Sequence, residues 1–271
     1  MKTQLTFRIT TFFFGVVLIL SACSKNLVTG KSQLSLIPEK ELQEMSLVQY
    51  NEFIAKSNLI KSPERNALIV NEVGSKISSA VDRYFSSKNQ PDALNGYKWE
   101  YNLVKDSVIN AWCMPGGKIV VYSGILPITL NENALAVVVG HEVSHALLQH
   151  GNQRMSESLL QQMGGIALSV ALSKKPAETK NIFLNAYGIG TEIGVMLPFS
   201  RKQELEADRF GLIWAAMAGY DINEAIPFWE RMQSKSGGAK IPEFLSTHPS
   251  DETRIQKIKQ YLTEAKTYSG K

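Results

Sequence analysis

The chain has 271 residues, of which 44% are hydrophobic and 20% charged, a composition typical of a globular protein with a substantial core. Its net charge of +4 falls to +2 without Lys2 and Arg8, which lie in a segment that we expect to be removed. A charge this small and dispersed argues against a nucleic-acid-binding protein.

Residues 1–22 have the pattern of a bacterial lipoprotein signal peptide. Lys2 and Arg8 precede the apolar stretch TTFFFGVVLIL, which is too short to span a bilayer. The stretch ends in LSAC at 20–23, which resembles a lipobox, so we expect Cys23 to be acylated and to anchor the protein in a membrane. In the lipoproteins that this segment resembles, a residue other than Asp after the cysteine, here Ser24, favours the outer membrane of a Gram-negative cell, with the protein facing the periplasm, over the inner membrane. A soluble secreted protein with an incidental Cys23 is the alternative.

The residues that follow predict a tether and then one folded domain. Residues 23–36 show no helical period and are expected to form the tether, and residues 37–271 the domain. Helices are predicted after Pro38 and over about 63–84, both as scaffold. Alternation over 99–106 and 118–126 predicts a small antiparallel sheet, with a turn at Gly116 and Gly117. With Cys23 acylated, Cys113 is the remaining thiol, and we interpret it as a small buried apolar residue.

The stretch NALAVVVGHEVSHALLQHG, at 133–151, carries the strongest chemical signal. On a helix, His141 and His145 are four residues apart and share a face, so both can bind one metal ion, while Glu142 points at what the metal holds. This HExxH arrangement supplies two zinc ligands and a general base. Two polar histidines on an ordinary helix are the alternative. Gly151 is expected to end the helix, and His150 to be an exposed residue at its end.

Two apolar segments follow, at 159–173 and 182–199. Each is interrupted by glycine or charge, and neither reaches the roughly 20 apolar residues that a spanning helix needs. We interpret both as helices of the domain core.

A catalytic zinc site needs a third protein ligand, and SRKQELEAD at 200–208 offers one. Glu204 and Asp208 are four residues apart and share a helical face. If Glu204 reached the metal, Asp208 would be close enough to accept the free N–H of a ligand histidine and fix its tautomer. Taken alone, these acidic residues would be a solvated helix face.

Four ordered blocks together resemble the gluzincin metallopeptidases of the HtpX and CAAX-prenyl-protease superfamily. They are NAW followed by PGG at 110–117, HEVSH at 141–145, SRKQELEAD at 200–208, and STHPS at 246–250 followed by Arg254 and Ile255. The resemblance implies an α+β, mainly helical zincin-type domain with its small antiparallel sheet next to the HExxH helix. It also implies one Zn²⁺ bound by His141, His145 and Glu204. The lipobox narrows it to the periplasmic lipoprotein branch.

His248 and Arg254 are further candidates near the metal. From spacing alone, His248 would be a helix-capping or surface residue. The resemblance implies that it can approach the metal from a mobile loop, as a fourth ligand or a substrate contact. Arg254 is a candidate partner for the acidic residues near the site.

The predicted function is hydrolysis of peptide bonds by a metal-activated water, with Glu142 as the general base. The strand Lys118, Ile119, Val120, Val121 and Tyr122 is expected to hold the substrate as an added antiparallel strand, which favours extended or unfolded chains. Location and family indicate unfolded or misassembled envelope proteins as substrates. Two alternatives remain: a zinc-dependent chaperone or assembly factor for outer-membrane proteins, and a structural lipoprotein with a vestigial site.

Overall fold

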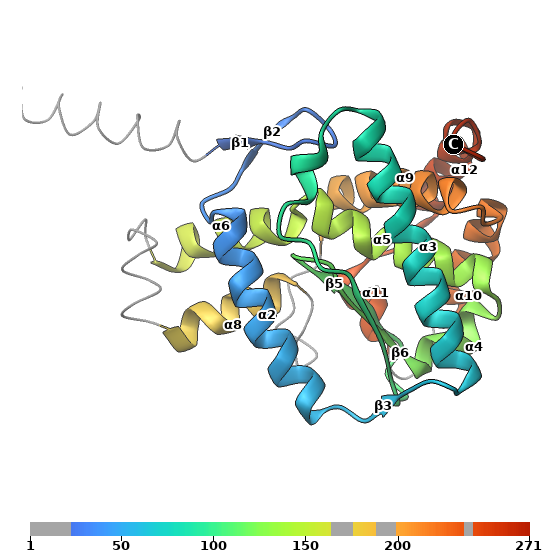
Figure 1. Ribbon diagram of the computed structural model, residues 1–271, viewed down its shortest axis with the longest axis horizontal. Helices are drawn as coiled ribbons and strands as arrows, with labels where there is room; N and C mark the ends of the chain where they lie inside the picture. Colours follow the sequence, from blue (N-terminus) through green and yellow to red (C-terminus); the bar gives the residue numbers. More distant parts are fainter. Residues whose placement is uncertain (1–22, 164–175, 188–198, 236–240) are drawn as a thin grey trace, which may run out of the picture.

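The computed structural model describes residues 23–163, 176–187, 199–235 and 241–271, and the signal-peptide prediction for 1–22 lies outside them (Figure 1). Most of the described chain is helical, with short strands gathered before residue 123. The α-helices are α2 (Glu39–Lys56), α3 (Arg65–Ser87), α4 (Leu126–Thr129), α5 (Glu132–Leu147), α6 (His150–Met163), α8 (Pro176–Ala186), α9 (Arg201–Met217), α10 (Ala225–Ser234), α11 (Glu243–Thr247) and α12 (Glu252–Lys266). The 3-10 helices are η1 (Pro91–Leu94), η2 (Ser123–Ile125) and η3 (Ile222–Glu224). The strands are β1 (Cys23–Lys25), β2 (Ser32–Leu34), β3 (Leu59–Ile60), β4 (Glu100–Val104), β5 (Ala111–Met114) and β6 (Lys118–Tyr122).

The main sheet has the strand order β3-β4-β6-β5. Its β3–β4 and β5–β6 pairings are antiparallel, and β4 pairs with β6 in parallel. Gly116 and Gly117 form the β5–β6 turn with φ values of +82° and +81°, which glycine adopts without strain. The predicted α+β fold with a small sheet beside the HExxH helix is confirmed. One pairing in this sheet is parallel, because β5 lies on the far side of β6 and leaves β6 next to β4.

This strand order contradicts the predicted substrate strand. Strand β6, Lys118–Tyr122, is hydrogen-bonded to β4 on one side and to β5 on the other, and all five of its residues are buried. An interior strand has no free edge for an added peptide. The prediction for β6 was therefore wrong, and β5 is the outer strand at this side of the described sheet.

Alternating side chains of the sheet enter two separate apolar clusters. Ala111, Cys113, Ile119 and Val121 pack with α3, α5 and α9. Trp112, Met114, Val120 and Tyr122 pack with α2 and α8 on the opposite face. Figure 1 shows the same division, with α2 and α8 on one side of the sheet. The two-residue period therefore buries both faces, and α5 lies against β5.

Helices α5 and α9 approach each other closely because each contributes a glycine at their contact. A Cβ on Gly140 would lie 2.6 Å from the carbonyl oxygen of Gly211, and one on Gly211 would lie 2.7 Å from the backbone nitrogen of His141. Neither distance is tolerated between a methyl group and a backbone. The two glycines thus bring the α9 carboxylates next to the HExxH residues.

Residues 23–34 form a docked hairpin where the sequence predicts a tether. Strands β1 and β2 pair antiparallel, and Asn26 in the turn donates from Nδ2 to the carbonyl of Leu147 at 3.1 Å. Lys31 Nζ lies 2.7 Å from Glu206 Oε1 on α9. Leu36 N–H donates to Ser156 Oγ on α6 at 2.9 Å. The segment after Cys23 is therefore packed against the end of the HExxH helix.

The HExxH helix ends earlier than predicted. Helix α5 stops at Leu147, the chain turns at Gln149 with φ +57°, and α6 begins at His150. Gly151 lies inside α6, where a Cβ would collide with the ring of Tyr187. Parts of the two later apolar segments, 164–173 and 188–198, lie outside the described residues. Among the helices that the structure describes, none is long and apolar enough to cross a bilayer.

Candidate metal centre

Helix α5 positions the two HExxH histidines. Asn131 caps its first turn by accepting a hydrogen bond from the Ala134 N–H at 2.9 Å. One turn apart, His141 and His145 direct their Nε2 atoms to the same point, 3.0 Å from each other. Both side chains are buried, with 3% and 4% exposed. The predicted placement of the two imidazoles on one helical face is confirmed.

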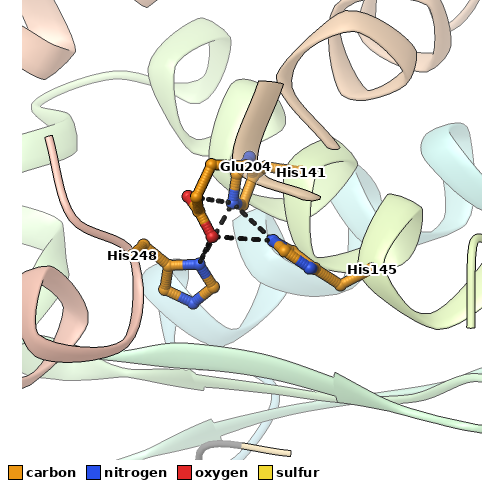
Figure 2. Close-up of side chains that lie close together, drawn as sticks. All are labelled: His141, His145, Glu204 and His248. Atoms are coloured by element: carbon orange, nitrogen blue, oxygen red, sulfur yellow. Dashed lines mark hydrogen bonds and ion pairs between the residues drawn. The ribbon is translucent and has the colours of Figure 1, made fainter. Parts of the chain in front are cut away.

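Glu204 reaches the same point from the first turn of α9. A capping box between Ser200 and Gln203 fixes the start of this helix. Glu204 Oε1 lies 3.4 Å from His145 Nε2, and its Oε2 lies 3.5 Å from His141 Nε2 (Figure 2). The carboxylate is 1% exposed, so the acidic segment is not the solvated face that it would be alone.

His248 joins this group at the C-terminal end of α11. Its Nδ1 lies 3.0 Å from Glu204 Oε1 and 3.2 Å from His141 Nε2. The side chain is buried and stacks on the ring of Phe199, which rules out the surface position suggested by spacing alone. His141, His145, Glu204 and His248 each offer a ligand atom, and these atoms all lie within 4.8 Å of one another.

The chemistry of these four side chains fits a zinc ion. His141 Nδ1 faces a carboxylate oxygen of Asp208, so its proton belongs there and its Nε2 keeps a lone pair. Burial lowers the pKa of His145 well below its usual value and that of His248 to about 4, so both imidazoles are neutral. Nitrogen lone pairs and a carboxylate therefore converge in a buried space, an arrangement that a cation stabilises. Imidazole nitrogens with one carboxylate are typical zinc ligands.

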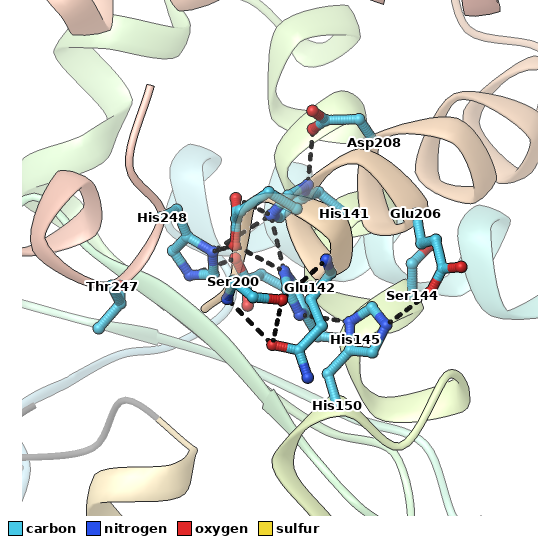
Figure 3. A network of polar contacts seen from close by, with 12 residues as sticks. His141, Glu142, Ser144, His145, His150, Ser200, Glu206, Asp208, Thr247 and His248 are labelled. Atoms are coloured by element: carbon cyan, nitrogen blue, oxygen red, sulfur yellow. Dashed lines mark hydrogen bonds and ion pairs between the residues drawn. The ribbon is translucent and has the colours of Figure 1, made fainter. Parts of the chain in front are cut away.

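Asp208 and Arg254 fix His141 through its Nδ1 atom, which faces away from the cluster. Asp208 Oδ1 lies 2.9 Å from His141 Nδ1, the contact predicted from the spacing of Glu204 and Asp208 (Figure 3). Arg254 donates from Nε and Nη2 to the two Asp208 oxygens at 2.8 and 2.9 Å, and its Nη1 lies 2.6 Å from Glu204 Oε2. Burial alone would raise the pKa of both carboxyl groups, but the Arg254 charge holds them below their usual values. The predicted pairing of Arg254 with acidic residues is confirmed.

Glu142 lies beside the cluster and is not part of it. Its side chain is 4% exposed, and Oε1 lies 3.4 Å from His248 Nε2. No described residue donates a hydrogen bond to that oxygen. Burial, followed by the negative charge of Glu204, raises the pKa of Glu142 well above its usual value. A carboxylate in this environment binds a proton readily, as a general base requires.

His150 is placed differently from the prediction. It is fully buried, with its Nδ1 2.9 Å from His145 Nδ1 and its Nε2 3.5 Å from Glu206 Oε2. His150 follows His145 by five residues, a spacing that does not place two side chains on one face of a helix. The contact arises because the chain turns at Gln149 and brings the ring back against α5.

Two histidines and a glutamate from a neighbouring helix, with a second carboxylate beside them, define the site of a zinc-dependent hydrolase. The family model described as peptidase family M48 matches residues 72–262. The chain belongs to peptidase family M48, whose metalloproteases use zinc.

Proteins similar to this chain also carry names of proteases. The chain is similar to the mitochondrial metalloendopeptidase OMA1 of Schizosaccharomyces pombe, with 37% identity over 173 residues, covering 64% of this chain and 49% of that protein. It is 32% identical over 167 residues to a putative beta-barrel assembly-enhancing protease of Vibrio cholerae, covering 59% of this chain and 34% of that protein. It is 27% identical over 197 residues to the metalloprotease YcaL of Escherichia coli, covering 72% and 75%. The chain spans about half the length of the OMA1 relatives.

Proposed function

We propose that this protein is a zinc-dependent endopeptidase that cleaves unfolded or misassembled proteins of the cell envelope. The observation that carries the proposal is the meeting of His141, His145 and Glu204 in one buried cluster, with Glu142 beside it. The relatives named metalloendopeptidase and metalloprotease support the reaction type.

The side chains of this site divide the chemistry between them. His141, His145 and Glu204 would hold the zinc, with His248 as a fourth ligand or a substrate contact. When bound, zinc supplies a Lewis acid that activates water and polarises the scissile carbonyl. Glu142 removes the proton of the attacking water as the C–O bond forms, and delivers it to the leaving amine as the C–N bond breaks. Asp208 keeps the His141 proton on Nδ1 throughout.

The outer strand β5 is the part of the sheet suited to an extended substrate. In the β5–β6 pairing, Tyr122 N–H donates to Asn110 O, so the hydrogen-bonded pairs fall on even-numbered β5 residues. The backbone groups of Ala111 and Cys113 therefore point away from β6, toward the outer edge. Burial, followed by the negative charge of Glu142, raises the pKa of the Cys113 thiol, so β5 runs near the proposed general base. Backbone pairing at this edge would select unfolded chains with little side-chain preference.

A lipid anchor at Cys23 would hold this site near a membrane surface. Cys23 begins the hairpin that packs on α5, so there is little free chain between the proposed acyl group and the folded domain. We propose the outer membrane, with the domain facing the periplasm, and the membrane contact made through the lipid. Labelling with radioactive palmitate tests this step: incorporation should be lost in Cys23→Ser, and incorporation that persists would contradict it.

The decisive test of the enzymatic proposal compares the wild type with Glu142→Gln, each purified and loaded with zinc. Glutamine keeps the size of the side chain and cannot accept the proton, so degradation of an unfolded protein should fall at least roughly 100-fold. Zinc content should stay the same, because Glu142 is not among the clustered ligand atoms. Equal degradation by both proteins would refute the proposal. A wild type that prevents aggregation without cleaving would favour the chaperone alternative.

A further inference from the structure

A row of side chains behind His145 leads from the metal cluster to the N-terminal hairpin. His150 Nδ1 lies 2.9 Å from His145 Nδ1, and His150 Nε2 lies 3.5 Å from Glu206 Oε2 (Figure 3). The other oxygen of Glu206 lies 2.7 Å from Lys31 Nζ. His150 is fully buried, whereas the Glu206 side chain is 20% and the Lys31 side chain 62% exposed. The inner contacts are therefore shielded from water and the outer one is not.

The positions of the protons follow from these contacts. His145 Nε2 faces the cluster and must offer a lone pair to bind a metal, so the imidazole proton belongs on Nδ1. That N–H then donates to His150 Nδ1, which must be the unprotonated nitrogen of its ring. The His150 proton consequently lies on Nε2, the atom that faces the Glu206 carboxylate. All three groups are consistent with a single arrangement of protons.

His141 and His145 are thus oriented in different ways. The Nδ1–H of His141 donates to a buried carboxylate, Asp208, which Arg254 holds in place. The Nδ1–H of His145 donates to a neutral ring, and the far nitrogen of that ring faces the Glu206 carboxylate at 3.5 Å. The ring of Phe199 also packs on His145, with the centroids 3.9 Å apart, and fixes its plane without a hydrogen bond.

We infer that His150 is a positioning residue, which fixes the tautomer and ring orientation of His145 for zinc binding and is itself oriented by Glu206. The inference rests on the zinc site of the proposed function and adds a residue to it. Groups that hydrogen-bond to a ligand histidine typically change metal affinity by about 10- to 100-fold. His150 should therefore contribute to zinc affinity although it does not touch the metal.

The test measures zinc affinity by competition with a chromophoric chelator in two matched variants. His150→Phe keeps a ring of similar size and removes the acceptor, so zinc should bind about 10- to 100-fold more weakly. His150→Asn places its Oδ1 near the position of Nδ1 and should restore most of the lost affinity. Thermal unfolding of the metal-free proteins checks that both variants fold. With saturating zinc, the remaining defect should fall on kcat and leave KM unchanged.

Wild-type zinc affinity in a folded His150→Phe protein would overturn the inference. Equal losses in the Phe and Asn variants would also overturn it, because packing and not the hydrogen bond would then be responsible. If His150→Phe does not fold, Glu206→Leu against Glu206→Gln tests the next link, and equal zinc affinity in that pair would count against the inference. A wild type that binds zinc without cleaving peptides would refute the peptidase proposal alone, since these measurements report metal affinity.

Discussion

Replacing Arg254 by leucine should destabilise the protein strongly, because the change leaves two buried carboxylates without their cation. Arg254 is 2% exposed, and Glu204 and Asp208 are 1% and 4% exposed. The change removes two hydrogen bonds to Asp208, the 2.6 Å contact with Glu204, and a guanidinium 3.8 Å from the centroid of the Trp229 ring. Removing one partner of a buried ion pair costs roughly 3–5 kcal/mol. In a domain of this size the midpoint of thermal unfolding should fall by roughly 6–20 °C.

The chain offers a matched control for this variant. Arg209 on α9 pairs with Glu264 on α12 through two contacts of 2.7 and 2.6 Å, and so joins the same two helices as Arg254 and Asp208. These side chains are 43% and 35% exposed, so Arg209→Leu should cost only about 0.2–1 kcal/mol. Unfolding is measured with zinc and with a chelator. The Arg254→Leu loss should be smaller with zinc, which gives Glu204 a positive partner. Equal losses in the two variants would refute the argument from burial.

Two further changes test the helix contact and the buried thiol. In Gly211→Ala the new methyl group would lie 2.7 Å from the His141 nitrogen, so α9 must move away from α5. We expect a net loss of about 1–3 kcal/mol in unfolding free energy and a lower zinc content, and a variant as stable and as zinc-loaded as the wild type would contradict this. Burial raises the pKa of the Cys113 thiol well above its usual value. Iodoacetamide at pH 8 should therefore leave Cys113 unmodified, as judged by mass spectrometry, until the protein is unfolded, and rapid labelling of the folded protein would contradict its burial.

The sequence predicted the site correctly where two side chains are brought together by their spacing along one helix. The i, i+4 relation of His141 and His145 follows from helix geometry, and so does the shared face of Glu204 and Asp208. That Glu204 meets the two histidines could not be derived in this way. The meeting depends on the close contact of α5 and α9 at Gly140 and Gly211, whose effect appears only when the two helices are packed together.

The misplaced features all depend on contacts between distant segments. Alternation identified β6 correctly as a strand but carried no information on its neighbours, so its interior position was missed. The hairpin at 23–34 has no strong strand pattern and is held by contacts to residues more than 100 positions away, such as Asn26 with Leu147. His150 was expected at an exposed helix end because nothing in its spacing marks the turn at Gln149.

The outer edge of β5 leads to a last prediction, on the substrate. If a peptide adds to this edge, its residue opposite Cys113 must present a backbone N–H, while the next residue points its N–H away. A series of substrate peptides, each N-methylated at one position, should therefore show an alternating pattern of cleavage rates near the scissile bond. Each lost hydrogen bond costs about 0.5–1.5 kcal/mol, or about 2- to 12-fold in kcat/KM. Side-chain changes at the same positions serve as the control and should matter less. A smooth profile without alternation would mean that the substrate does not pair with β5.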